Sequence, residues 1–201
     1  MPTDAAGNII PDFGDRPAAP TGAPAGTGAP GAYAGPRKMA YICSKGNLDM
    51  AYPALIMANA ALGEGIEVHI FFTFWGLDMV DVRTMDDLKF TLSGNTAMHM
   101  PQLERLRGGL GAMGMPQAMG NLPGMTGFAT RMMKQQMADL DIPTVREMIE
   151  QVAAMGANLW ACQLTVEMMQ IKKAQLHPAV KDVISAADFI EKSEGAQIVF
   201  V

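Results

Sequence analysis

Cysteine is scarce in this sequence, which has only Cys43 and Cys162 among its 201 residues. Two cysteines this far apart cannot form the dense disulfide framework of a small secreted domain, and a zinc ribbon would need more ligands at closer spacing. The three histidines, His69, His99 and His177, are scattered and show no metal-ligand spacing. The sequence therefore predicts free thiols and no metal site.

Charge is also sparse, at 17% of residues, and the formal net charge is -5. No basic stripe is available to neutralise phosphates, which argues against a nucleic-acid binder. The first residues lack the basic flank and apolar block of a secretory signal. We therefore expect a cytoplasmic protein, in a compartment that keeps both thiols reduced.

Residues 1–36 have little apolar material to bury, as in "APTGAPAGTGAPGAYAG". They hold seven of the 13 prolines and seven of the 21 glycines. Such a stretch cannot offset the entropy lost on ordering. We predict a disordered tail over 1–36 and a single folded domain over 37–201.

The remaining chain alternates between short apolar runs and segments with helical periodicity. A parallel sheet covered by helices on both faces is the architecture that this alternation predicts, with about five strands. One helix should follow Asn47 and end at Gly63, and another should begin at a capping box formed by Thr144 and Glu147. The strands are expected at 38–44, 66–74, 158–162, 180–185 and 196–201, with helices at 48–63, 75–82, 145–155, 163–171 and 186–194.

A region rich in glycine and methionine interrupts the alternation over about 84–140. Nine of the 19 methionines lie between Met98 and Met137, and residues 108–130 carry no charge. That length could span a membrane, but seven glycines and two prolines oppose a stable helix there. We expect an inserted flap over the core, and the alternatives are a surface that docks a partner or membrane, and a transmembrane helix.

Nucleotide-binding motifs receive little support. "GLGAMG" at 109–114 matches GxGxxG, yet it follows the polar "QLERLR" and not a strand, which the dinucleotide motif requires. "CSKG" lacks the first glycine of a P-loop. We predict no cofactor.

Both cysteines lie at the carboxyl ends of predicted strands, where open parallel sheets gather ligands and chemistry. Cys162 also precedes a helix, whose N-terminus favours a thiolate. A strand order of 2-1-3-4-5 would make the first and third strands neighbours, so both sulfurs would face one crevice, with Lys45 adding positive charge. The alternative is that both are buried structural thiols, because free cysteine is among the most buried residue types.

Four stretches of the chain resemble the DsrE/DsrF-like sulfurtransferase family, in particular its larger subgroup often labelled "peroxiredoxin family". These stretches are "SKGNLDMAYPALIMANAA", "EVHIFFTFWGLDMV", "NLPGMTGFATRMMKQQM" and "ACQLTVEMM". The resemblance implies a flavodoxin-like sheet, an oligomer, and transfer of sulfane sulfur through a cysteine that Cys162 matches. The peroxiredoxin label does not fit, because Leu159 stands where that active site needs a threonine three residues before its cysteine.

The resemblance also implies partners, namely a TusA-like sulfur carrier, a rhodanese or a heterodisulfide-reductase-like complex. On this interpretation Cys162 holds sulfur as a persulfide or S-thiosulfonate and passes it to an acceptor thiol. Gln163 and Thr165 are candidate polar neighbours, and Cys43 a candidate second thiol. The rival hypothesis is a non-catalytic assembly protein that docks a partner complex or a membrane through its methionine-rich segment.

Overall fold

The computed structural model describes residues 37–95, 108, 114 and 117–201. The predicted tail and most of the "GLGAMG" segment therefore lie outside the described residues. The described part belongs to one compact unit.

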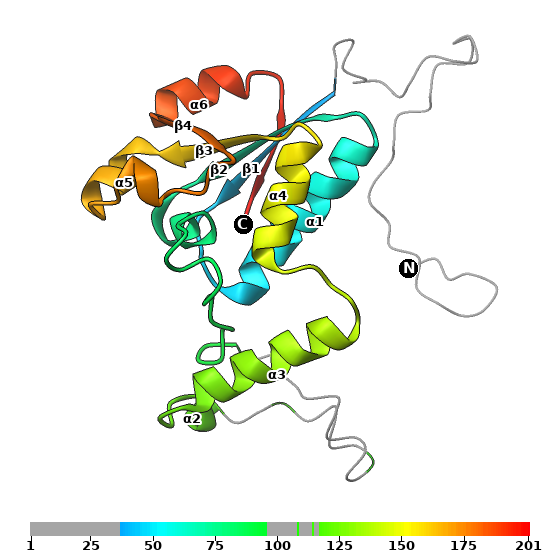
Figure 1. The fold of residues 1–201 in the computed structure, drawn as a ribbon, viewed down its shortest axis with the longest axis vertical. Helices are drawn as coiled ribbons and strands as arrows, with labels where there is room; N and C mark the ends of the chain where they lie inside the picture. Colours follow the sequence, from blue (N-terminus) through cyan, green and yellow to red (C-terminus); the bar gives the residue numbers. More distant parts are fainter. Residues whose placement is uncertain (1–36, 96–107, 109–113, 115–116) are drawn as a thin grey trace, which may run out of the picture. The chain divides into compact units, whose positions relative to one another are not determined.

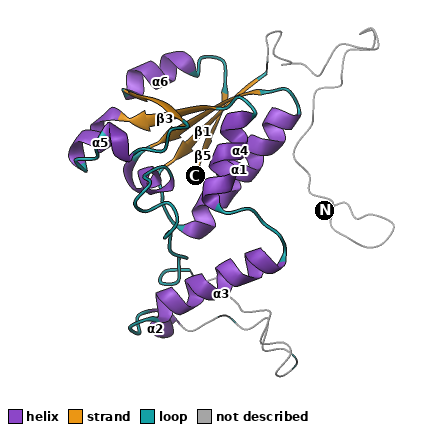
Figure 2. Cartoon of the chain, in the orientation of Figure 1, coloured by secondary structure: helices purple, strands orange, loops and turns teal. Residues whose placement is uncertain are grey.

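Its centre is an all-parallel sheet of five strands (Figures 1 and 2), as the alternating pattern predicted. The spatial order is β4-β3-β2-β1-β5, and the register pairs Cys43 with Phe72 and Cys162 with Ile184. The strands are β1 (Lys38–Cys43), β2 (Glu67–Phe72), β3 (Asn158–Cys162), β4 (Val180–Ile184) and β5 (Gln197–Phe200).

Helices cover both faces of the sheet. On one face lie α1 (Leu48–Gly63) and α4 (Val145–Ala154), which pack with the sheet into the main core. On the other face α6 (Ala186–Lys192) places Phe189 against a smaller cluster that contains Phe71 and Cys162. Three short helices complete the connections, η1 (Phe74–Met79), α5 (Gln163–Met168) and η3 (Lys173–Gln175).

Local sequence signals explain where these helices begin and which side they bury. The α4 helix begins at the predicted capping box, in which Thr144 accepts from the Glu147 backbone N–H and Glu147 accepts from that of Thr144. In α1, Leu55 is fully buried, whereas Ile56 is exposed. The inner face of α1 is narrow and lined largely with alanines.

The predicted strand order was also wrong, because β2 and not β1 lies beside β3. The reason is the side on which the connecting helices lie. Right-handed crossovers on the same face of a sheet advance in the same direction. Since α1 and α4 pack together on one face, β1, β2 and β3 follow one another in space. The direction reverses only after β4, where α6 covers the opposite face and β5 returns to the free side of β1.

The described part of the methionine-rich region contains two helices, α2 (Gln117–Gly120) and α3 (Met125–Asp139). Met133 and Met137 of α3 pack against the main core, and the Thr130 hydroxyl accepts a hydrogen bond of 3.0 Å from the Phe90 backbone N–H. Of the helices in the described residues, none has the length and apolar character to span a bilayer. The inserted-flap interpretation of residues 84–140 as a whole stays a prediction.

Candidate functional site

The candidate site forms around Cys162, the last residue of β3 and the residue that precedes α5. The side chain lies on the α6 face of the sheet with Phe71 and Ile184, and only 6% of its surface is exposed. The thiol therefore lies at the carboxyl edge of the sheet, largely covered but not sealed, as the sequence placed it.

Two threonines bring hydroxyl groups to this edge. Thr165, in the first turn of α5, is buried, and its Oγ1 lies 3.3 Å from Oγ1 of Thr73, the residue that follows β2. The backbone N–H of Phe74 donates to Thr165 Oγ1 at 3.1 Å. Because this hydroxyl already accepts from Phe74, its own proton is available to donate to another group.

The thiol whose charge these groups influence is that of Cys162. Burial opposes the charged form, but hydrogen bonding from the Thr165 hydroxyl and backbone N–H, from the Thr73 hydroxyl and from the Leu164 backbone N–H outweighs it. The net effect lowers the pKa of Cys162 below that of an ordinary thiol. No capping bond of ordinary geometry links the sulfur to α5, so we attribute the stabilisation to the whole group of donors.

The elements that carry these threonines also expose large apolar side chains. Phe74 and Trp75 of η1 and Leu164 and Met168 of α5 are each at least half exposed. The start of η1 is held to α5 by the bond between Phe74 and Thr165. The thiol is thus flanked by two short elements with apolar surfaces, a feature of protein interaction sites.

Cys43 does not share this environment. Its register with Phe72, and that of Phe72 with Ala161, place it on the main-core face of the sheet, whereas Cys162 faces α6. Burial raises the pKa of Cys43 to about 12. The two sulfurs therefore do not face a common crevice, because β2 separates their strands and the side chains point to opposite faces.

The remaining candidates from the sequence have distinct positions. Lys45 is exposed in the loop after β1 and is not among the groups that shift the pKa of Cys162. Gln163 is exposed and donates to Glu167 Oε1 at 2.9 Å. Of the predicted polar neighbours, only Thr165 is brought to the sulfur. Sequence reasoning missed Thr73, although a polar residue directly after the buried run "IFF" was a usable signal.

Residues 36–201 match the DsrE/DsrF/DrsH-like family. The chain belongs to that family. The chain is also 36% identical, over 154 residues, to "Sulfur carrier protein DsrE2" of Allochromatium vinosum, an alignment that covers 76% of this chain and 91% of that protein.

Two further similarities are weaker. "Uncharacterized protein YrkE" of Bacillus subtilis is 24% identical over 165 residues, covering 82% of this chain and 97% of that protein. A solved structure, that of the protein of unknown function MTH1491 from Methanobacterium thermoautotrophicum, has a TM-score of 0.47 and 8% identity, with 82% of this chain and 99% of that one covered.

Proposed function

We propose that this member of the DsrE/DsrF/DrsH-like family is a sulfur carrier that binds sulfane sulfur on Cys162 and delivers it to the thiol of another protein. Two findings support the proposal. One is the similarity to a sulfur carrier protein over most of both chains. The other is the observation that carries the assignment to a residue, namely a thiol whose pKa is lowered by hydroxyl and backbone donors at the carboxyl edge of the sheet.

The proposed reaction is a thiol exchange at sulfur. The Cys162 thiolate attacks the terminal sulfur of a donor persulfide, a new S–S bond forms, and the donor leaves as a thiolate. The transferred sulfur brings the proton of the donor persulfide with it, and once this proton is lost to solvent the Cys162 persulfide carries the same charge as the original thiolate. The donors from Thr73, Thr165 and Leu164 that stabilise the thiolate can therefore also stabilise the persulfide anion.

Delivery of the sulfur is the same exchange with an acceptor thiol as the attacking group. We propose a protein acceptor, because the site is flanked by the exposed apolar residues Phe74, Trp75, Leu164 and Met168. A TusA-like carrier, a rhodanese or a heterodisulfide-reductase-like complex would fit this role. Cys43 is not part of the proposed chemistry, since it lies buried on the other face of the sheet.

The test is mass spectrometry of the intact protein after incubation with polysulfide, thiosulfate or tetrathionate, followed by peptide mapping. We expect added sulfur on the peptide that contains Cys162, and its release by dithiothreitol. Cys162→Ser should remain folded and gain no sulfur, while Cys43→Ala serves as the matched control and should load normally. A Cys162→Ser protein that loads as well as the native chain would refute the proposal and favour the assembly-protein hypothesis.

A further inference from the structure

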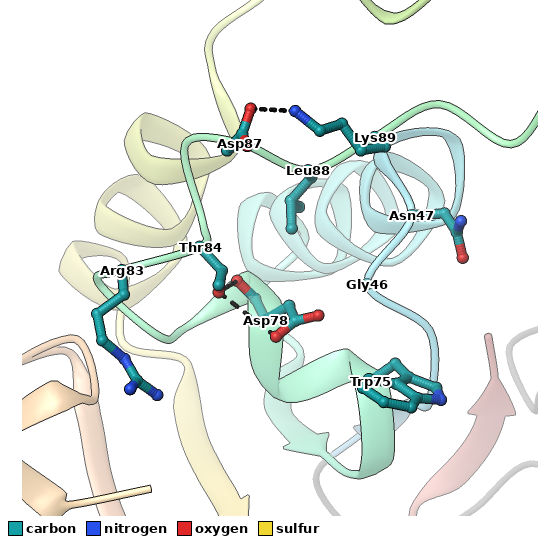
Figure 3. Close-up of a pocket in the computed structure, with 9 residues that line it drawn as sticks. All are labelled: Gly46, Asn47, Trp75, Asp78, Arg83, Thr84, Asp87, Leu88 and Lys89. Atoms are coloured by element: carbon teal, nitrogen blue, oxygen red, sulfur yellow. Dashed lines mark hydrogen bonds and ion pairs between the residues drawn. The ribbon is translucent and has the colours of Figure 1, made fainter. Parts of the chain in front are cut away.

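A pocket of about 430 Å³ lies beside the loops that follow β1 and β2 (Figure 3). Gly46 and Asn47 contribute from the first loop, and Trp75 and Asp78 from η1 after the second strand. Its volume is within the range of small-molecule sites. Its position outside the carboxyl ends of parallel strands is where α/β folds bind ligands. The pocket contains neither cysteine.

The cations that line this pocket are already paired with carboxylates. Lys89 bonds to Asp87, and both side chains are at least half exposed. Arg83 donates through Nε and Nη2 to the two carboxylate oxygens of buried Asp81, at 2.9 and 2.6 Å. Figure 3 shows the Arg83 guanidinium extending away from the Asp78 carboxylate. Arg83 favours the charged form of Asp78 at longer range, but among the described residues neither lining cation forms an ion pair with that carboxylate.

Asp78 is the remaining carboxylate among the residues that line the pocket. It is half-buried, and within the described part of the chain no Lys, Arg or His forms an ion pair with it. The Thr84 hydroxyl is 3.4 Å from its Oδ1, and the same hydroxyl is closer, at 3.1 Å, to its backbone carbonyl. Burial raises the pKa of Asp78. A bound cation would offset that unfavourable burial of charge.

An aromatic ring lines the same pocket as this carboxylate. Trp75 and Asp78 are three residues apart in a 3₁₀ helix, where side chains at that spacing eclipse one another. Figure 3 shows both extending from η1 on the side of Gly46. Gly46 allows the close approach of its loop, since a Cβ there would lie 2.4 Å from the Trp75 carbonyl oxygen and 2.9 Å from Asp78 Cβ. A carboxylate beside an exposed indole is the combination that recognises ammonium groups.

We propose that this pocket binds a small organic ammonium ion, whose charged nitrogen contacts the Asp78 carboxylate and the face of Trp75 and whose apolar stem packs on Leu88. This function is distinct from sulfur transfer at Cys162, although Trp75 borders both sites, and either can fail without the other. The ion pairs of Arg83 and Lys89 remain in place in the bound state and disfavour strongly cationic, polyvalent ligands.

The test is a titration of the full chain with butylammonium. Binding is monitored by NMR of the two tryptophan indole N–H signals and by calorimetry. The chain has only two tryptophans, so a Trp75→Phe variant assigns both signals. We expect butylammonium to shift the Trp75 signal, and butanol and butyrate, which have a similar stem without the positive charge, to leave it unchanged. The Trp160 signal is the internal control.

Variants locate the charge that binds the ligand. Asp78→Asn should weaken butylammonium binding by about tenfold, or 1.4 kcal/mol, and Asp78→Glu should restore part of the affinity. Asp182→Asn is the matched control and should bind normally, because that carboxylate is exposed and lies outside the pocket. If Asp78→Asn is unstable, Trp75→Ala tests the same site from an exposed position and should also weaken binding. Absence of binding to the native chain, equal binding of butanol, or equal loss in Asp182→Asn would overturn the proposal.

Discussion

Replacement of Thr165 by valine tests whether hydroxyl donors control the charge of Cys162. Valine keeps the shape of threonine but removes Oγ1, which helps to lower the pKa of Cys162 and accepts from the Phe74 N–H at 3.1 Å. A hydrogen bond to a charged group contributes about 1.5–3 kcal/mol. Since the Thr165 hydroxyl stabilises the thiolate form, we expect Thr165→Val to raise the pKa of Cys162.

The assay is the rate of iodoacetamide alkylation of Cys162 across a pH series, with mass spectrometry to separate it from the buried Cys43. At a pH below both pKa values, each unit of increase lowers the thiolate fraction about tenfold, and the alkylation rate should fall in proportion. Sulfur loading should slow in parallel. At a pH above both values the two proteins should react at similar rates, which separates a pKa effect from a change in access.

The control is Thr165→Ser, which retains the hydroxyl and should keep a pKa close to the native value. Thr165→Val also leaves the Phe74 N–H without its partner, so we expect a loss of stability of about 1–3 kcal/mol. A variant that remains folded at the assay temperature and shows an unchanged alkylation profile would refute the role of Thr165. The thiolate would then depend on the backbone amides and Thr73 alone.

Three further predictions test the placement of Cys43, the start of α4 and the close approach of η1 to β1. Cys43→Ala should leave the sulfur loading of Cys162 unchanged, as measured by intact mass, because the two side chains occupy opposite faces of the sheet; slower loading in a folded variant would return Cys43 to the mechanism. Thr144→Ala removes the capping box of α4 and should lower the free energy of unfolding, measured in urea, by about 0.5–2 kcal/mol. Thr144→Ser is the control, and an equal loss of stability in both variants would contradict the capping role. Gly76→Ala should destabilise the protein strongly, since its Cβ would lie 2.0 Å from the Cys43 carbonyl oxygen. Gly63→Ala meets open space at the end of α1 and should stabilise the protein slightly. Similar melting temperatures for the two variants would refute the close approach at Gly76.

The elements of the sheet and its main helices could be predicted from local signals. The sequence runs that form β1, β2 and β3 are apolar and bounded by polar residues. The limits of α4 are marked by the capping box before it and by Gly156 after it, which has a φ of 104°. These signals act within a few residues of the chain. They do not specify on which face a crossover helix packs, and the strand order depends on that choice.

The error in strand order explains why Thr73 was missed and why Lys45 was expected beside Cys162. With β1 beside β3, the neighbours of Cys162 would come from the loop after β1, which contains Lys45. With β2 beside β3, they come from the residues after β2, which begin with Thr73. Sequence position alone predicted that Cys162 lies at the carboxyl edge of the sheet. The hydroxyl of Thr73 lies near it only because β2 pairs with β3, and these strands are 85 residues or more apart in the sequence.

The same geometry determines what kind of carrier the proposed function allows. A dithiol site could form a disulfide as it releases sulfur, because a second thiolate would attack the persulfide from within the chain. Here the second thiol lies on the opposite face, and burial raises its pKa to about 12, so it is protonated at neutral pH. Under the proposed function, a Cys162 persulfide therefore passes its sulfur only to a thiol from another molecule. Loaded protein kept free of other thiols should retain its sulfur without forming a disulfide between Cys43 and Cys162, and non-reducing peptide mapping that finds this disulfide in the native fold would refute the separation of the two sulfurs.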